Sequence, residues 1–198
     1  KCPGEIVQGD KTGDEPLSET IKRYLKEKYA KPGNVYLGVV HRLDRPVSGV
    51  VLFAKTSKAL PRLNKMFSTH EQVQKTYLAI VGARPPQEAG TLTHWLTRNE
   101  KSNTARAYQR EVPGSKKAIL DYRLIGSSDR YFLLEVHLHT GRHHQIRCQL
   151  AAMGCPIKGD LKYGAPRSNP DGSISLHAYR LQLEHPVSHQ MLDIKVPL

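Results

Sequence analysis

The chain has 198 residues, and its 30 Lys and Arg against 18 Asp and Glu give a formal net charge of +12. This length fits one domain or two small lobes that share a core. The positive charge favours a partner with a phosphate backbone, with a merely basic soluble protein as the alternative. Aromatic residues make up only 7%, which argues against base stacking as the main means of binding.

The cysteines and the hydropathy pattern bear on the compartment. Cys2, Cys148 and Cys155 form an odd set without Cys-x-x-Cys spacing, which favours a reducing environment over a disulfide scaffold or a zinc ribbon. No segment reaches transmembrane length, and the N-terminus has no apolar secretory segment. We therefore expect a cytoplasmic monomer without membrane contact; organellar targeting stays open because Lys1 is not an initiator methionine.

Helical and strand patterns alternate along the first half of the chain. Apolar residues recur at helical spacing over residues 17–25 and 60–67, which predicts two amphipathic helices. Residues 35–40 predict a short strand, and the apolar run 50–54 predicts a buried strand. In Val73–Val81, one face would carry Val73, Lys75, Tyr77, Ala79 and Val81 and the other Gln74, Thr76, Leu78 and Ile80, and this pattern also predicts a strand.

The second half is richer in strand patterns. Residues 98–117 form a basic connector, and residues 143–153 predict a helix that Gly154 ends. Many strands with few helices predict an α+β domain on a large, mainly antiparallel sheet. The remaining strands are predicted at residues 91–96, 118–125, 131–138, 174–183 and 192–196.

The most informative segment runs from His41 to Gly49 and reads His-Arg-Leu-Asp-Arg-Pro-Val-Ser-Gly. It places Asp44 between Arg42 and Arg45, and nearby positive charge favours the ionised form of a carboxylate. An ionised carboxylate can act as a nucleophile, and arginines suit a polyanionic substrate. A turn residue or a structural salt bridge is an equally good interpretation of this segment alone.

A second segment lies in the predicted strand Val73–Val81, where Lys75, Tyr77 and Ala79 share one face. A tyrosine that faces a cleft can accept or donate a proton if its environment lowers its pKa. Without Asp44 elsewhere in the chain, we would expect this tyrosine simply to pack its ring.

A third segment, Thr-Gly-Arg-His-His-Gln-Ile-Arg at residues 140–147, combines a glycine turn with the start of a predicted helix. Such a turn directs backbone N–H groups toward an anion, and Arg142, His143 and His144 add side-chain donors. Arg147 is placed to reach a buried carboxylate and hold it ionised. The alternative is a solvated basic helix end, although basic residues in a first turn oppose the helix dipole.

Two other features have weaker interpretations. His137, His139, His143 and His144 could form a metal cluster, but no Asp or Glu is spaced to complete it. We expect no metal and interpret these histidines as core or RNA-facing residues. The basic connector 98–117 is interpreted as an arm that grips a folded RNA, with a solvated loop as the alternative.

These segments, in this order, resemble the RluA-type family of RNA pseudouridine synthases over essentially the whole chain. The resemblance is carried by the His-Arg-Leu-Asp block, Lys-x-Tyr at 75–77, Thr-Gly-Arg-x-His-Gln-Ile-Arg at 140–147, and Gly-x-Pro-Ile-x-Gly-Asp-x-x-Tyr-Gly at 154–164. Cys2, Val47 and Gln149 stand where the family usually has Pro, Thr and His. These departures bear on substrate contacts more than on chemistry.

The resemblance implies a central mixed, mainly antiparallel sheet with a cleft across it, and a reaction without cofactor or metal. It implies that Asp44 is the catalytic aspartate, that Tyr77 assists proton removal near uracil C5, and that Arg147 is the partner of Asp44. It further implies one catalytic domain over residues 1–198, lacking its first strand and any S4-type RNA-binding domain. Contacts to RNA are expected from His41, Arg42, Arg45, Arg142, His144 and Gln145, with Arg42 filling the space of the flipped-out uridine.

We therefore expect isomerisation of uridine to pseudouridine in a structured RNA, such as a tRNA or rRNA stem-loop. Attack by Asp44 on C1′ and abstraction of a ribose proton both stay open. The first alternative is an RNA-binding or RNA-folding module whose catalysis is dispensable. A base-releasing nucleoside hydrolase and a histidine-based metal nuclease are further alternatives.

Overall fold

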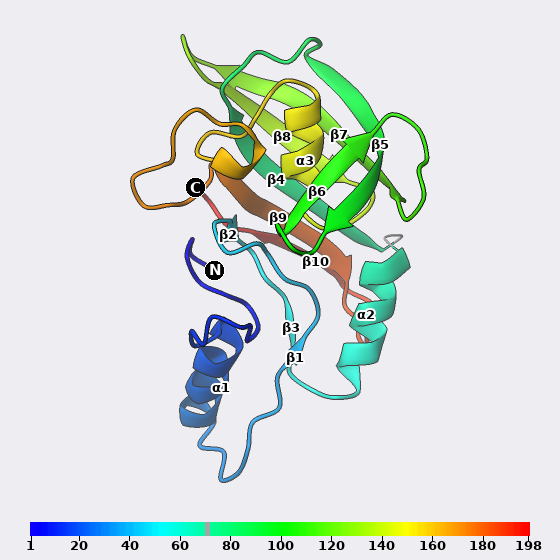
Figure 1. The fold of residues 1–198 in the computed structure, drawn as a ribbon. Helices are drawn as coiled ribbons and strands as arrows, with labels where there is room; N and C mark the ends of the chain where they lie inside the picture. The colour runs from blue at the N-terminus through cyan, green and yellow to red at the C-terminus, as the bar shows by residue number, and fades with distance from the viewer. Residues whose placement is uncertain (70–71) are drawn as a thin grey trace.

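An eight-stranded sheet forms the centre of the computed structural model, which describes residues 1–69 and 72–198 (Figure 1). The strand order is β10-β9-β4-β8-β7-β5-β6, and neighbours along this path are antiparallel. The short strand β2 (Ser48–Gly49) runs parallel to β9, so the predicted mixed, mainly antiparallel sheet is confirmed. The other strands are β4 (Val73–Val81), β5 (Ala89–Asn99), β6 (Thr104–Tyr108), β7 (Lys116–Ser127), β8 (Phe132–Leu138), β9 (Leu176–Glu184) and β10 (Met191–Lys195).

The strand predictions are confirmed where alternation is long. β4 has the predicted bounds, and β7 and β8 pair as the predicted hairpin. The buried strand expected at 50–54 is wrong: only β3 (Phe53–Ala54) forms there, paired with β1 (Gly38–Val39). Residues 50–52 instead pack their side chains, partly buried, against two core clusters, so their apolar character reflects packing rather than strand pairing.

The basic connector 98–117 is also more regular than predicted. It contains β6, which pairs antiparallel with β5 to form the β5–β6 hairpin at one edge of the sheet. Ala105 and Ala107 of β6 pack against a small cluster with Leu96 and Cys148. Two alanines give too weak an apolar alternation to distinguish this strand from a loop in the sequence.

Three α-helices in the described part of the chain accompany the sheet. α1 (Leu17–Lys28) and α2 (Ala59–Thr69) confirm the two amphipathic predictions, and α3 (Gln145–Ala152) lies against one face of the sheet (Figure 1). No helix in the described residues is long and apolar enough to cross a membrane. α3 begins two residues later than predicted, because His144 has a left-handed backbone with φ +50°.

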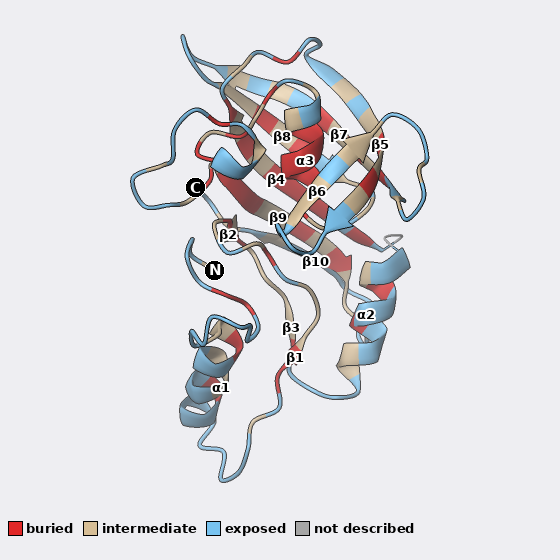
Figure 2. Cartoon of the chain, viewed as in Figure 1, coloured by how far each residue is buried: buried red, intermediate tan, exposed pale blue. Residues whose placement is uncertain are grey.

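The main core lies between α3 and the sheet, where buried residues concentrate (Figure 2). Leu120, Leu134 and Leu150 are fully buried there. Leu43 and Val47, which flank Asp44 in sequence, belong to the same cluster. The loop that carries Asp44 is therefore anchored in the core on both sides of the carboxylate.

Gly49 in β2 provides a test of how this loop is held. Its φ is +120°, and a Cβ there would overlap the backbone of Ala178 in β9. Gly114 also has a positive φ, +75°, but nothing lies within 4 Å of its added Cβ. We expect Gly49→Ala to lower the free energy of unfolding by about 1–3 kcal/mol more than Gly114→Ala, as measured by urea denaturation. Equal losses would show that the β2–β9 contact does not constrain the loop.

Candidate active site

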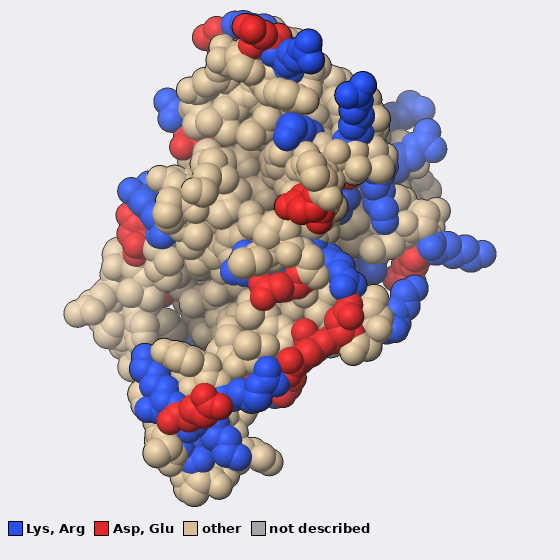
Figure 3. All heavy atoms as spheres, turned by 90° about the vertical axis from the view of Figure 1, so that its left-hand side faces the viewer, with Lys and Arg blue, Asp and Glu red and all other residues tan. Residues whose placement is uncertain are grey.

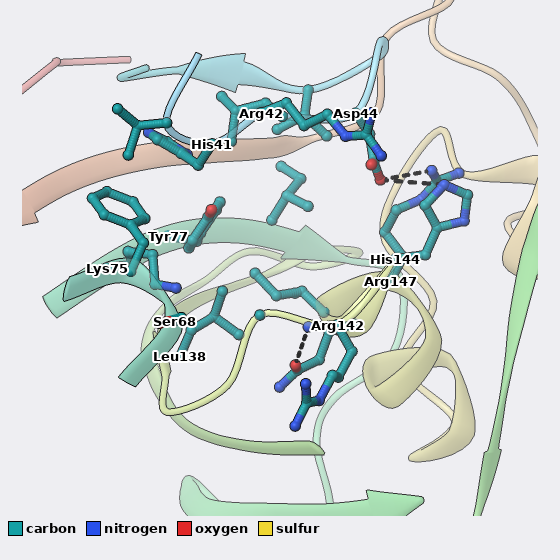
Figure 4. A pocket seen from close by; sticks show the side chains of 18 of the residues that line it. His41, Arg42, Asp44, Ser68, Lys75, Tyr77, Leu138, Arg142, His144 and Arg147 are labelled. Atoms are coloured by element: carbon teal, nitrogen blue, oxygen red, sulfur yellow. Dashed lines mark hydrogen bonds and ion pairs between the residues drawn. The ribbon is translucent and has the colours of Figure 1, made fainter. Parts of the chain in front are cut away.

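A cleft of about 500 Å³ opens between the 40–44 segment, β4 and the start of α3. Asp44, Tyr77 and Arg147 all line it, although Asp44 and Arg147 are 103 positions apart in the chain. Figure 4 shows Asp44, His144 and Arg147 together at one end, His41 and Lys75 toward the other, and Tyr77 between them. The structure thus brings together the three side chains that the sequence singled out.

The carboxylate of Asp44 is fixed by a buried guanidinium. Arg147 Nη1 donates to Asp44 Oδ2 at 3.0 Å. On its other side, Arg147 donates from Nε and Nη2 to the two oxygens of Asp160 at 2.7 and 2.8 Å. The side chain of Asp160 is 1% exposed, whereas that of Asp44 is 29% exposed. One carboxylate is therefore enclosed and the other faces the cleft.

Arg147 remains charged in this setting. Burial by itself lowers the pKa of its guanidinium, but the hydrogen bonds and charges of Asp160 and Asp44 raise that pKa above its usual value. The guanidinium also lies over the ring of Tyr163, 5.0 Å from its centroid. A buried ion group of this kind is stable only when every charge keeps a partner.

His144 is the second neighbour of Asp44, because its Nε2 lies 3.5 Å from Asp44 Oδ2. We expected His144 to contact RNA from the first turn of a helix. It precedes the helix, is 7% exposed, and stacks on His143 with ring centroids 3.8 Å apart. Burial lowers its pKa to about 3 despite the opposing charge of Asp44, so the ring is neutral at pH 7.

Tyr77 lines the cleft from β4, next to a register shift between β4 and β9 at Thr76 and Tyr77. We considered a proton-transfer role if its environment lowered the pKa. The environment does the opposite: burial, and then the charge of Asp44, raise the pKa of the Tyr77 phenol far above its usual range. The hydroxyl is therefore neutral at physiological pH.

Five of the six expected RNA contacts line the cleft: His41, Arg42, Arg142, His144 and Gln145. His41 Nε2 accepts the Leu52 N–H at 3.0 Å, and burial lowers its pKa to about 4. Arg142 is exposed and donates from Nε to a backbone oxygen of β7. Arg42 is also exposed, so both arginines line the cleft and remain accessible to solvent.

Two of the six expected RNA contacts, Arg45 and Gln145, are engaged by groups of the protein itself. Arg45 is outside the residues that line the cleft; it donates to Gly4 O and pairs with Asp14. Gln145 is 3% exposed, accepts from Thr140 and from the Arg142 N–H, and donates to a backbone oxygen. Its amide closes the 140–145 turn, which leaves the N–H of Arg142 bonded within the protein rather than directed at an anion.

Sequence reasoning gave no role to Asp160, Tyr163 or Lys75. Asp160 and Tyr163 both lie in the 154–164 motif, and that motif is the feature of the sequence that could have identified them as site residues. Lys75 lines the cleft, and burial lowers its pKa to about 8. All three residues therefore contribute charge or hydrogen bonds to the cleft or its supporting wall.

The histidines do not converge on one point. His137 contacts Thr76 and Glu135, whereas His139 contacts Asp121; His144 faces Asp44. Within residues 1–69 and 72–198, no three His, Cys, Asp or Glu side chains are grouped in a way that could hold a metal ion.

Comparison with known proteins identifies the chain's relatives. A chain from Chloroflexus aurantiacus, an uncharacterised RNA pseudouridine synthase, is 39% identical over 84% of this chain and 51% of its own length. The tRNA pseudouridine synthase C of Salmonella typhimurium is 36% identical over 80% of this chain and 66% of that protein. The chain spans about half the length of the first curated relatives that it matches.

Solved structures share the fold. Human RNA pseudouridylate synthase domain containing 4 aligns over 100% of this chain and 83% of its own, with a TM-score of 0.81 and 23% identity. A sequence model of RNA pseudouridylate synthases matches residues 1–152. Because that match covers more than half of the 198 residues, the chain belongs to the RNA pseudouridylate synthase family, of the RluA type that its motifs resemble.

Proposed function

We propose that residues 1–198 form a catalytic domain that isomerises uridine to pseudouridine in a structured RNA. The observation that carries this proposal is the cleft-facing carboxylate of Asp44, hydrogen-bonded to the buried Arg147. A tRNA or rRNA stem-loop is the proposed substrate, and relatives named tRNA pseudouridine synthase C favour tRNA. The family match supports the reaction type.

The proposed reaction balances without a co-reactant. The N1–C1′ bond of the uridine breaks, the base turns, and a C5–C1′ bond forms. C5 then loses its proton, and N1 gains one. Asp44 acts at the sugar, either by attacking C1′ or by removing a ribose proton, and its carboxylate is released at the end of the cycle.

Arg147 has the role of orienting this carboxylate. Its bond to Asp44 uses one nitrogen, while Asp160 fixes the other two. In a cleft closed by RNA, the lower effective dielectric constant strengthens this pairing. Asp160 thus acts through Arg147 as a positioning residue.

Tyr77 is proposed to support the flipped uracil with its ring and to help the C5 proton leave. Because its pKa is raised, a phenolate base is not available near pH 7. The neutral hydroxyl can act only as a proton relay: its oxygen accepts one proton while the hydroxyl donates its own. Its contribution therefore belongs to the last step of the reaction.

The β5–β6 hairpin and its surroundings are proposed to hold the RNA outside the cleft. Arg98 lies near enough to His143 to lower its pKa electrostatically, after burial and the opposing charge of Asp44. Phosphate contacts at the hairpin would offset the cost of removing the uridine from its stack, a few kcal/mol. On the face that Figure 3 draws, Lys and Arg side chains also gather along the right-hand edge of the view. The exposed cations of the hairpin and its surroundings include Arg98, Lys101, Arg106, Arg110, Lys116 and Lys117.

The first test removes the charge of Asp44. We expect Asp44→Asn to abolish conversion, a loss of at least about 10³-fold in kcat, while the Kd for RNA changes less than about threefold. Conversion is measured by mapping pseudouridine in RNA incubated with each variant. An active Asp44→Asn would refute the catalytic assignment and favour an RNA-folding role.

The second test concerns the hydroxyl of Tyr77. We expect Tyr77→Phe to lower kcat and to make proton removal rate-limiting, so that uridine carrying deuterium at C5 reacts more slowly than ordinary uridine. The wild-type pH profile should show no ionisation of Tyr77 at or below its usual pKa of 10.0, because burial holds it protonated. An alkaline rise that disappears in Tyr77→Phe would show a phenolate base instead.

The third test concerns the hairpin charges. We expect the triple variant Arg98→Gln, Lys101→Gln, Arg106→Gln to bind RNA with a weaker salt dependence. The slope of log K for RNA binding against log salt concentration should become less negative by about 2–3, because each lost phosphate contact removes about 0.7–0.9 from it. The matched control replaces three exposed arginines elsewhere: Arg84, Arg123 and Arg130. Equal effects from both variants would mean that only net charge matters.

A further inference from the structure

We infer that Tyr163 and His144 form a hydrogen-bonded chain that positions Asp44, with the Tyr163 hydroxyl fixing the imidazole so that its Nε2–H faces the carboxylate. This inference rests on the proposed function and assigns residues that support the reacting group rather than residues that touch the substrate. His144 lies in the 140–147 motif and Tyr163 in the 154–164 motif, but the sequence gave neither residue a role in positioning Asp44.

The direction of the chain follows from its first donor. The backbone N–H of Ala105 in β6 donates to the Tyr163 oxygen at 2.7 Å. The phenol oxygen is therefore an acceptor at that contact, and its own hydrogen is available for His144 Nδ1, 2.8 Å away. A tyrosine hydroxyl has one hydrogen to donate.

The neutral imidazole then has its hydrogen on the other nitrogen. When Nδ1 accepts, the ring carries its hydrogen on Nε2, and Nε2 lies 3.5 Å from Asp44 Oδ2. The opposite tautomer would direct a lone pair at the carboxylate, which is electrostatically unfavourable. The charges that act on this ring are the acid Asp44 on one side and Arg147, His143 and Lys162 on the other.

Backbone conformation and ring packing also fix the position of the His144 imidazole. The left-handed backbone of His144 aims the ring back toward Asp44, a conformation in which His occurs more often than most residues. His143 stacks on one face, and Tyr163 meets the ring edge-on at 5.6 Å. Tyr163 also packs under the Arg147 guanidinium, so it contacts both neighbours of the carboxylate.

The chain begins on the β5–β6 hairpin. η1 (Leu161–Tyr163) is joined to the hairpin twice: Lys162 donates to Ser102 O and Asn103 O, and Tyr163 accepts from Ala105. The element proposed to hold RNA is therefore connected to Asp44 through only two side chains, Tyr163 and His144. A hairpin displaced from η1 would leave the Tyr163 hydroxyl without the contact that orients it.

The test removes the hydroxyl and keeps the ring. We expect Tyr163→Phe to lower kcat by about tenfold to a hundredfold with KM for RNA essentially unchanged, while the lost contacts to the Ala105 N–H and to His144 lower the denaturation midpoint of a protein that still folds. In nitrogen-correlated NMR spectra, His144 of the wild type should carry its hydrogen on Nε2, and Tyr163→Phe should mix the two tautomers. The matched control, Tyr131→Phe, removes an exposed hydroxyl at the β7–β8 turn and should change neither readout.

A second variant covers the case in which Tyr163→Phe folds poorly. His144→Gln keeps an amide N–H that can reach Asp44, so it should retain more activity than His144→Ala. A wild-type hydrogen on Nδ1, or a folded Tyr163→Phe with kcat within twofold of wild type, would overturn the inference. If the wild type converts no uridine, the proposed function fails, whereas the NMR result still decides the tautomer by itself.

Discussion

The site depends on one guanidinium shared between two carboxylates. Burying Arg147 costs several kcal/mol unless its charge is matched, and the two bonds to Asp160 provide that match inside the protein. The remaining nitrogen is then fixed in direction before any substrate arrives, and it meets Asp44 at the cleft. The buried Asp160 holds Arg147 in place. Arg147 can therefore orient the carboxylate of Asp44 while that carboxylate stays open to the cleft.

This arrangement is rigid because apolar neighbours anchor both partners. Leu43 and Val47 bracket Asp44, and Ile146 precedes Arg147; all three side chains belong to the main core cluster. Interiors packed in this way resist small displacements, which is what a preorganised reactive group requires. The sheet contributes Tyr77 from β4, an interior strand between β9 and β8. Packing between α3 and the sheet therefore sets the geometry of the charged groups.

Residues governed by local pattern were predictable, and those governed by tertiary contact were not. β4 followed from a run rich in β-branched and aromatic residues, and the Asp44–Arg147 contact followed from the motifs. Arg42 and Arg45 look equivalent around Asp44, yet only Arg42 lines the cleft, because a loop has no periodicity that assigns sides. His144 gave no sign of its left-handed backbone, which glycine would have suggested. In the sequence, Asp160 resembles an ordinary polar loop residue, and its burial beside Arg147 is evident only from the structure.

The charge state of the site is consistent with a neutral histidine beside Asp44. Two carboxylates and one guanidinium leave a local charge of about −1, and a protonated His144 would cancel it. A cation in that position would hold Asp44 more tightly and make it a weaker nucleophile or base. Burial instead keeps the His144 pKa at about 3, so the ring that lies 3.5 Å from Asp44 carries no charge. Orientation of the carboxylate by Arg147 is thereby separated from its neutralisation, and other cations, Arg42 and Arg142 among them, line the cleft.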